Sequence, residues 1–169
     1  MPKKLYYIGN LPDPKKPAAA VVGARMCSPY GRCQAFKYAR TMASYGVQII
    51  SGMARGIDAE GHKGALDTDT PTFAVLGSGV DVCYPNSNRW LYQRILEKGG
   101  GIISELPPGS PPVNWAFPAR NRIISGLAEV VVIAEAKKKS GSLLIWKIFR
   151  KAFWKKVWRS SLRKIFRNL

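Results

Sequence analysis

Histidine, cysteine and acidic residues are scarce in this sequence. Among its 169 residues, His62 is the sole histidine, and the three cysteines form an odd set without a C-x-x-C pair. A catalytic triad built on histidine therefore has a single candidate base, and the cysteines indicate neither a disulfide framework nor a zinc site. The N-terminus lacks the apolar core of a signal peptide, so we expect a cytoplasmic protein.

The 10 acidic residues face 27 lysines and arginines, which gives a formal net charge of +17. Residues 1–136 hold all 10 acids and 15 basic residues, whereas residues 137–169 hold 12 basic residues and no acid. We therefore expect a folded domain, residues 1–143, and a chemically different tail, residues 144–169. A mildly basic domain suits nucleic-acid binding, although many other domains carry such charge on a solvated face.

Two nucleotide-binding signatures are absent. The first buried strand, residues 18–22, is followed by Gly23-Ala24-Arg25-Met26-Cys27-Ser28 in place of the dinucleotide fingerprint G-x-G-x-x-G. The next strand ends in Ser51, where a ribose-binding acid is typical, and no Walker lysine motif is present. NAD and nucleoside triphosphates are therefore not expected as ligands, and we expect no cofactor.

Apolar runs alternate regularly with helical patterns along the first 134 residues. We expect an edge strand at residues 5–10, core strands at 18–22, 47–51, 72–76, 101–104 and 130–134, and helices ending near Gly46 and spanning 58–66, 88–98 and 120–128. Near-continuous apolar strands separated by helices predict an α/β fold with a Rossmann-like, doubly wound, mainly parallel sheet.

The turn at residues 51–58 is the strongest candidate for a ligand site. It reads Ser51-Gly52-Met53-Ala54-Arg55-Gly56-Ile57-Asp58 and joins a strand to a helix. Its glycines let the backbone approach a ligand, the helix directs its positive end at the same place, and Arg55 adds a cation. These features predict an anion site, although strand, glycine-rich turn and helix also form the ordinary joint of any α/β domain.

Similar turns follow other strands of the predicted sheet. Ligands of open α/β sheets bind beyond the carboxyl ends of the strands, which is where these turns fall. The repetition predicts a site for a phosphate-bearing ligand, formed by Gly23, Arg25, Ser51, Gly52, Arg55, Gly56, Gly77, Ser78, Gly79, Arg120, Asn121, Arg122, Ser140, Gly141 and Ser142.

A series of ordered motifs resembles one family. The motifs are Val22-Gly23-Ala24-Arg25, residues 51–58 with His62, residues 74–81 with Tyr84-Pro85, Phe117-Pro118-Ala119-Arg120-Asn121-Arg122, and Ser140-Gly141-Ser142-Leu143. Over residues 5–143 the sequence is similar to the DNA-processing protein A family, also called DprA or Smf. The resemblance implies a fold that binds single-stranded DNA, protects incoming strands during natural transformation and loads a RecA-type recombinase onto them.

The same resemblance implies binding without catalysis. By motif, the basic DNA pocket of the family corresponds to Arg25 and Arg55, with Arg120, Asn121 and Arg122 as contributors. Arginine side chains and turn N–H groups bind phosphates without reading the base sequence.

Several other residues have both a functional and a structural interpretation. Tyr30, Tyr84 and Phe117 are candidates for stacking on bases, although each position also suits packing in the core or in a turn. For Asp58 and Asp81 we expect capping of the helix or turn that comes after them.

The sequence departs from the family after Leu143. The family continues with an alanine-rich helix, a strand and a Pro-Gly turn, whereas residues 144–169 contain no glycine or proline. We expect a frameshift or truncation near residue 143, which would remove much of the region through which the family forms homodimers. Members of the family usually carry a helical N-terminal domain before this fold, whereas we expect this sequence to start almost at the fold itself.

The tail has a helical pattern of its own. Apolar residues recur at spacings of mostly three and four from Ile145 to Leu169, and lysines and arginines fill the opposite positions. This pattern predicts a basic amphipathic C-terminal helix. The tail either packs on the sheet, stays disordered, or contacts a membrane surface, for which Trp146, Trp154 and Trp158 are suited.

Three function classes follow from these observations. The first is a protein that binds single-stranded DNA. The second, a phosphoribohydrolase of the lysine-decarboxylase-like group, would show a P-G-G-x-G-T-x-x-E signature, and Ser140-Gly141-Ser142 has neither its glycines nor its glutamate. The third is membrane-surface binding by residues 144–169.

Overall fold

The structure is a computed structural model that describes residues 4–136. A six-stranded sheet forms its centre. Its strand order is β1-β5-β4-β3-β2-β6. The strands are β1 (Tyr6–Gly9), β2 (Ala18–Val22), β3 (Gln48–Ser51), β4 (Thr72–Val75), β5 (Gly101–Ser104) and β6 (Val130–Ile133). Neighbouring strands pair in parallel, except that β1 pairs antiparallel with β5. The predicted α/β, mainly parallel sheet is therefore confirmed.

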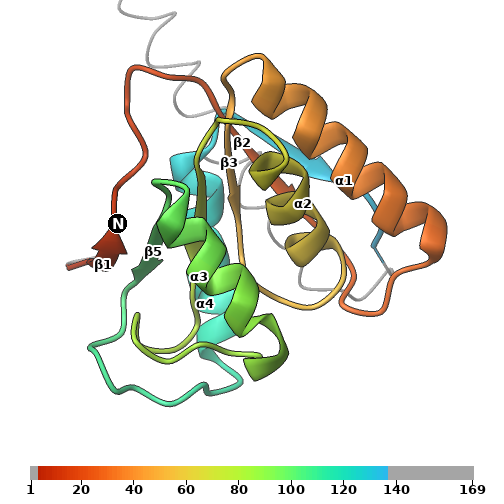
Figure 1. Ribbon diagram of the computed structural model, residues 1–169. Coiled ribbons are helices and arrows are strands. Elements are labelled where there is room, and N and C mark those ends of the chain that lie inside the picture. Colours follow the sequence, from red (N-terminus) through yellow and green to blue (C-terminus); the bar gives the residue numbers. More distant parts are fainter. Residues whose placement is uncertain (1–3, 137–169) are drawn as a thin grey trace, which may run out of the picture.

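Helices cover both faces of this sheet (Figure 1). On one face lie α1 (Pro29–Ser44), α2 (Ile57–Leu66) and α3 (Arg89–Glu97), the last preceded by a 3₁₀ turn at Asn86–Asn88. On the other face lies α4 (Ala116–Leu127). The chain runs outward from β2 to β5 along the first face and returns along α4 to β6, so the sheet is doubly wound.

Alternate residues of β2 face the two helical layers. Ala18, Ala20 and Val22 belong to the core cluster that contains α4 residues, whereas Ala19 and Val21 belong to the cluster that contains the buried alanines of α1. Because both faces are covered, all five residues of β2 are buried. A strand buried on both faces needs an unbroken apolar sequence, which explains why its bounds were predictable.

Helices α1 and α2 lie unusually close together where Gly64 of α2 faces α1. A Cβ atom on Gly64 would lie 2.3 Å from the carbonyl oxygen of Phe36 and 3.0 Å from the backbone nitrogen of Arg40. Only glycine therefore allows the two backbones to approach to this distance.

Two predicted elements differ from those in the structure. Helix α4 begins at Ala116 rather than Arg120 and contains Pro118 in its first turn, where the missing N–H would have had no helical partner. Strand β6, expected in the core, lies at an edge of the sheet within residues 4–136, and Val130 is 54% exposed. The turn Ser140-Gly141-Ser142, the domain boundary near residue 143 and the basic amphipathic helix lie outside the described residues.

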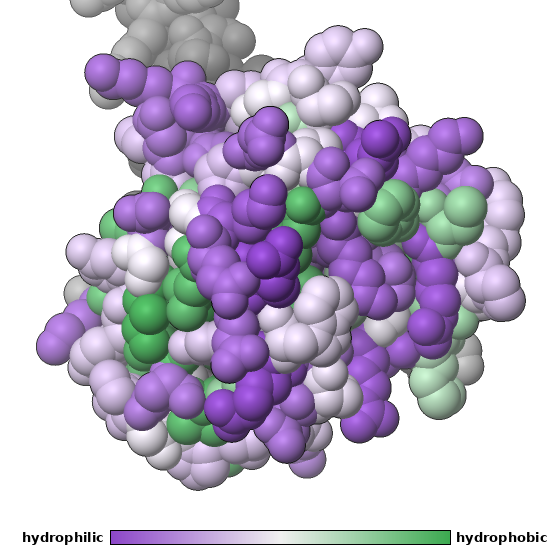
Figure 2. Space-filling view, in the orientation of Figure 1, coloured by the Kyte–Doolittle hydropathy of each residue, from purple (hydrophilic) through white to green (hydrophobic). Residues whose placement is uncertain are grey.

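The face formed by α1, α2 and α3 is mostly hydrophilic, with hydrophobic side chains in smaller patches (Figure 2). Within residues 4–136, no helix has both the length and the hydropathy that crossing a bilayer requires.

Candidate functional site

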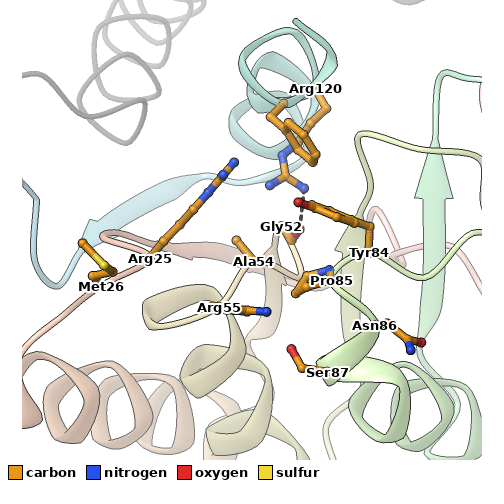
Figure 3. Close-up of a pocket in the computed structure, with 11 residues that line it drawn as sticks. Arg25, Met26, Gly52, Ala54, Arg55, Tyr84, Pro85, Asn86, Ser87 and Arg120 are labelled. Carbon is orange, nitrogen blue, oxygen red and sulfur yellow. Dashed lines mark hydrogen bonds between the residues drawn. The ribbon is translucent and has the colours of Figure 1, made fainter. Parts of the chain in front are cut away.

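A pocket opens at the carboxyl edge of the sheet, where the segments after β2, β3 and β4 meet the start of α4 (Figure 3). Four residues of the predicted phosphate site, Arg25, Gly52, Arg55 and Arg120, lie around this one cavity. Its volume is about 420 Å³, and it is lined by Arg25, Met26, Gly52, Ala54, Arg55, Tyr84, Pro85, Asn86, Ser87, Phe117 and Arg120.

Two exposed arginines reach this pocket from different segments. Arg25 follows β2, and Arg55 lies in the turn between β3 and α2. The ion pairs found within residues 4–136 include neither of them. Both positive charges are therefore available to an anionic ligand.

Arg120 is the third arginine of the pocket, and it is buried, with 6% of its surface exposed. Its Nη1 donates to the carbonyl oxygens of Gly52 and Val75, and its Nε donates to Asn121 Oδ1 at 3.1 Å. Its Nη2 lies 3.7 Å from Asp58 Oδ2. Burial lowers the pKa of Arg120 to about 10 despite the opposing effect of Asp58, so the guanidinium remains charged at neutral pH.

The carboxylate of Asp58 occupies the anion position that the turn at residues 51–58 was predicted to offer a ligand. Asp58 is the second residue of α2, and its carboxylate accepts hydrogen bonds from the backbone N–H groups of Ala54 and Gly23. Burial raises its pKa, while Arg120 and these hydrogen bonds act in the opposite direction. The expectation that Asp58 caps the helix after it is wrong, because its carboxylate binds residues that precede it in the chain.

Asp81 likewise does not cap the turn directly after it. Its two carboxylate oxygens accept a hydrogen bond from the N–H of Gly109, at 2.7 and 3.0 Å. Gly109 lies 28 residues further along the chain, in the proline-rich loop before α4. Asp81 therefore fixes that loop against the segment that follows β4.

A second carboxylate of the chain, that of Glu135, lies at the N-terminus of α1. It accepts hydrogen bonds from the N–H of Ser28 at 3.0 Å and from the Ser28 hydroxyl at 2.7 Å. The Ser28 Oγ in turn accepts from the N–H of Gly31 and caps the helix. In dinucleotide-binding sheets, a ligand phosphate sits at the helix that follows the first strand. Here that place, beside β2 and β6, holds a carboxylate of the protein.

Two aromatic rings form one wall of the pocket. The ring centres of Tyr84 and Phe117 lie 5.5 Å apart at an angle of 37°. The guanidinium of Arg25 lies 5.0 Å from the centre of the Phe117 ring. Tyr84 is 44% exposed, so its ring is accessible to a ligand. Tyr30, the third predicted stacking residue, is exposed but does not line this pocket.

The other predicted glycines support the walls of the pocket from behind. A Cβ on Gly23 would lie 2.6 Å from the side chain of Ile57, and one on Gly77 would lie 2.8 Å from the Phe117 ring. Gly56 has φ of +77°, a conformation that favours glycine. The N–H of Gly79 donates to the carbonyl of Ser110. These residues allow close backbone packing around the site.

The remaining predicted polar residues bind other groups of the protein. Ser51 and Ser78 donate their hydroxyls to the carbonyl oxygens of Val21 and Val82, and Asn121 accepts from Arg120. Arg122 forms an ion pair with Glu105 and does not line the pocket.

Five pocket residues were not among those predicted from the sequence: Met26, Ala54, Pro85, Asn86 and Ser87. Three of them follow Tyr84 directly, in a polar segment between β4 and α3. The available signal was an aromatic-proline pair followed by residues that form turns and hydrogen bonds. Within residues 4–136, no group of three or more His, Cys, Asp or Glu side chains is arranged to hold a metal ion.

Comparison with known proteins assigns the chain to a family. The model of the family described as DNA recombination-mediator protein A matches residues 1–152. The DNA processing protein DprA of Streptococcus pneumoniae is 45% identical over 143 residues, which cover 85% of this chain and 50% of that protein.

Two solved structures share the fold at substantial sequence identity. The X-ray structure of DprA from Streptococcus pneumoniae superposes with a TM-score of 0.80 at 42% identity, covering 87% of this chain and 51% of the other. A structure of DNA processing protein A from Helicobacter pylori, described in terms of its single-stranded DNA binding mode, superposes with a TM-score of 0.79. It is 34% identical, and the match covers 89% of this chain and 68% of the other.

The chain spans about half the length of the pneumococcal relative that it matches. The matched part contains the whole described sheet, all four helices around it and the pocket at its carboxyl edge. The resemblance seen in the ordered motifs is thus confirmed, and the chain belongs to the DNA recombination-mediator protein A family, whose members include DprA and Smf.

Proposed function

We propose that this chain binds single-stranded DNA, with the phosphate backbone held at the pocket by Arg25 and Arg55. The observation that carries the proposal is the convergence of two exposed arginines, free of ion pairs within residues 4–136, on one open cavity. The relative from Helicobacter pylori, whose structure is described by its single-stranded DNA binding mode, supports the same ligand class.

The chemistry of the pocket suits an unpaired strand. Guanidinium groups form charge-assisted hydrogen bonds to phosphate oxygens, and these bonds carry no base information. The exposed ring of Tyr84, next to Phe117, offers a surface on which a base can stack. Bases inside a duplex already stack on one another, so this surface favours single strands.

The family assignment extends the proposal to the biological role. We infer that the chain acts by binding rather than catalysis, in the cytoplasm, and delivers DNA strands to a RecA-type recombinase during natural transformation. The homodimer of the family and membrane contact by the tail depend on regions outside the described residues.

The alternative, a phosphoribohydrolase, gains no support from the site. Such an enzyme needs room for a sugar phosphate at the edge of the sheet. The N-terminus of α1 is occupied by Glu135, and the turn before α2 is occupied by Asp58. A ligand phosphate at either place would meet a carboxylate of the protein.

Replacing Arg55 or Arg25 with alanine is expected to weaken single-stranded DNA binding by about 10- to 150-fold each, because each change removes a charge-assisted hydrogen bond of about 1.5–3 kcal/mol. The slope of log affinity against log salt should fall by about 0.7 for each phosphate that the protein no longer neutralises. Both effects should be equal for oligonucleotides of different sequence. Fluorescence anisotropy titrations with the full chain at several salt concentrations measure both quantities.

Arg94→Gln provides the matched control. Arg94 lies on α3, is half exposed and pairs with Glu97 outside the pocket. Its replacement removes the same unit of charge as the pocket variants. Because this charge lies outside the pocket, the affinity should change much less than it does in Arg25→Ala or Arg55→Ala. Unchanged affinity and salt slope in both Arg25→Ala and Arg55→Ala would overturn the proposal.

A further inference from the structure

The three arginines of the pocket are not equivalent. Arg25 and Arg55 are exposed, whereas Arg120 is buried and forms hydrogen bonds with two other segments of the chain, at Gly52 and Val75. In Figure 3 its guanidinium lies above the turn that follows β3 and is joined to Gly52 by a hydrogen bond. This difference in environment indicates a difference in role.

The hydrogen-bonding capacity of Arg120 is largely used inside the protein. A guanidinium has five N–H hydrogens, two on each Nη and one on Nε. Both hydrogens of Nη1 have partners, the carbonyl oxygens of Gly52 and Val75, and the hydrogen of Nε goes to Asn121. Nη2 faces the Asp58 carboxylate at 3.7 Å. A phosphate that approached Nη2 would be repelled by this carboxylate.

The turn itself is shaped to receive the guanidinium. A Cβ on Gly52 would lie 2.2 Å from Nη2 of Arg120 and 2.5 Å from Oδ2 of Asp58. The absent side chain at Gly52 therefore leaves the space in which Arg120 and Asp58 meet. Three residues after Gly52, the same turn carries Arg55.

We propose that Arg120 is a positioning residue, which joins α4 to the turn at residues 52–56 and to the end of β4 and thereby holds Arg55 at the pocket. The inference rests on the proposed binding of DNA by Arg25 and Arg55. It assigns Arg120 a different task from the phosphate contact expected from the sequence. Asp58 completes the arrangement, because it balances the buried charge of Arg120 and accepts the N–H of Ala54 in the same turn.

Arg120→Lys separates the two roles. Lysine keeps the positive charge and can bind phosphate as a point charge. It lacks the planar guanidinium that donates hydrogen bonds to the carbonyl oxygens of both Gly52 and Val75. If Arg120 positions the turn, the variant should bind single-stranded DNA about 5- to 10-fold more weakly, and its salt slope should fall towards that of Arg55→Ala, whereas a direct phosphate contact kept by the lysine would leave the slope unchanged. The amides of residues 52–56 should also exchange faster with deuterium in the absence of DNA.

A double-mutant cycle with Arg55→Ala supplies the second measurement. A residue that acts through Arg55 should have almost no further effect once Arg55 is gone, so Arg120→Lys should then change the affinity by less than about twofold. Should Arg120→Lys impair folding, the pair Arg120→Gln with Asp58→Asn removes both buried charges together and enters the same cycle.

Arg94→Lys is the matched control. It makes the same substitution on α3, at a half-exposed arginine that does not line the pocket, so slow amide exchange at residues 52–56 and tight DNA binding should both persist. Wild-type affinity in Arg120→Lys, or an equal loss with and without Arg55, would overturn the positioning role and leave the proposed function intact. Unchanged binding in Arg25→Ala and Arg55→Ala would overturn the proposed function itself.

Discussion

Replacing Gly64 with alanine is expected to destabilise the protein by about 3 kcal/mol, although alanine is usually the better helix former by about 1 kcal/mol. The new methyl group would lie 2.3 Å from the carbonyl oxygen of Phe36 in α1. This oxygen belongs to a helix backbone and cannot move aside as the end of a flexible side chain can. Helices α1 and α2 would have to separate, with weaker packing along the face that they share.

Gly126→Ala is the matched control for this prediction. Gly126 also lies within a helix, α4, and an added Cβ there would meet no atom within 4 Å. This change should therefore stabilise the protein, by up to about 1 kcal/mol. Urea unfolding followed by circular dichroism compares the two variants with the wild type. A Gly64→Ala variant as stable as the wild type would show that the two helices can separate at no cost in stability.

Acidification from pH 6.5 towards pH 3 is expected to lower the free energy of unfolding through His62. His62 is completely buried, and its Nδ1 lies 2.8 Å from the Thr72 hydroxyl. Because that hydroxyl donates to the carbonyl of Ile49, it accepts from Nδ1–H, which leaves Nε2 as the unprotonated nitrogen. Within residues 4–136, Nε2 has no hydrogen-bond partner.

Protonation of His62 would thus bury a positive charge and an N–H without an acceptor. Burial, and then the charge of Arg120, lower the pKa of His62 from 6.5 to about 3. Between these values the unfolded chain binds a proton that the folded chain does not. The contribution of neutral His62 to the free energy of unfolding is therefore fully present above pH 6.5. It falls as the pH drops through this window, by up to about 5 kcal/mol in total.

Asp58 changes stability in the opposite direction. Burial raises its pKa above 3.8, so the folded state binds the proton more tightly between 3.8 and the raised value. Protonation of Asp58 therefore raises the free energy of unfolding as the pH falls through that range. The contribution of His62 must therefore be isolated by a variant rather than taken from the wild-type curve alone.

His62→Asn supplies this comparison. Asparagine can donate to Thr72 from its amide nitrogen, but it does not titrate in this range. The difference in unfolding free energy between wild type and variant should shrink steadily as the pH falls from 6.5 to 4. Chemical denaturation at several pH values measures it. Parallel curves for the two proteins would contradict the prediction.

The fold was largely predictable because strands β2, β3, β4 and β5 are buried on both faces. Such strands carry unbroken apolar sequences, so β2 and β5 have the bounds expected from the sequence. Strand β6 has an equally apolar sequence but lies at an edge within residues 4–136. Apolar composition indicates a strand without indicating how many neighbours it has, and only the pairing pattern supplies that information.

The candidate site was predictable in part. Glycine-rich turns with arginines located Arg25 and Arg55, since the carboxyl ends of parallel strands share one edge. The distinction between these arginines and Arg120 was not predictable, because it depends on Asp58 and on two backbone carbonyls that belong to other elements. Asn86 and Ser87 were missed because an irregular segment reaches the pocket only through the three-dimensional fold.

The position of β2 between β3 and β6 also has a consequence during protein synthesis. In the folded protein β2 pairs with β3 on one edge and with β6 on the other, and β6 is the last of the three strands to be synthesised. At about 5–20 residues per second, the roughly 110 residues between β2 and β6 take about 5–20 s to translate. Throughout this interval a nascent chain presents an apolar, unpaired strand edge, which is the feature that chaperones bind and that promotes aggregation.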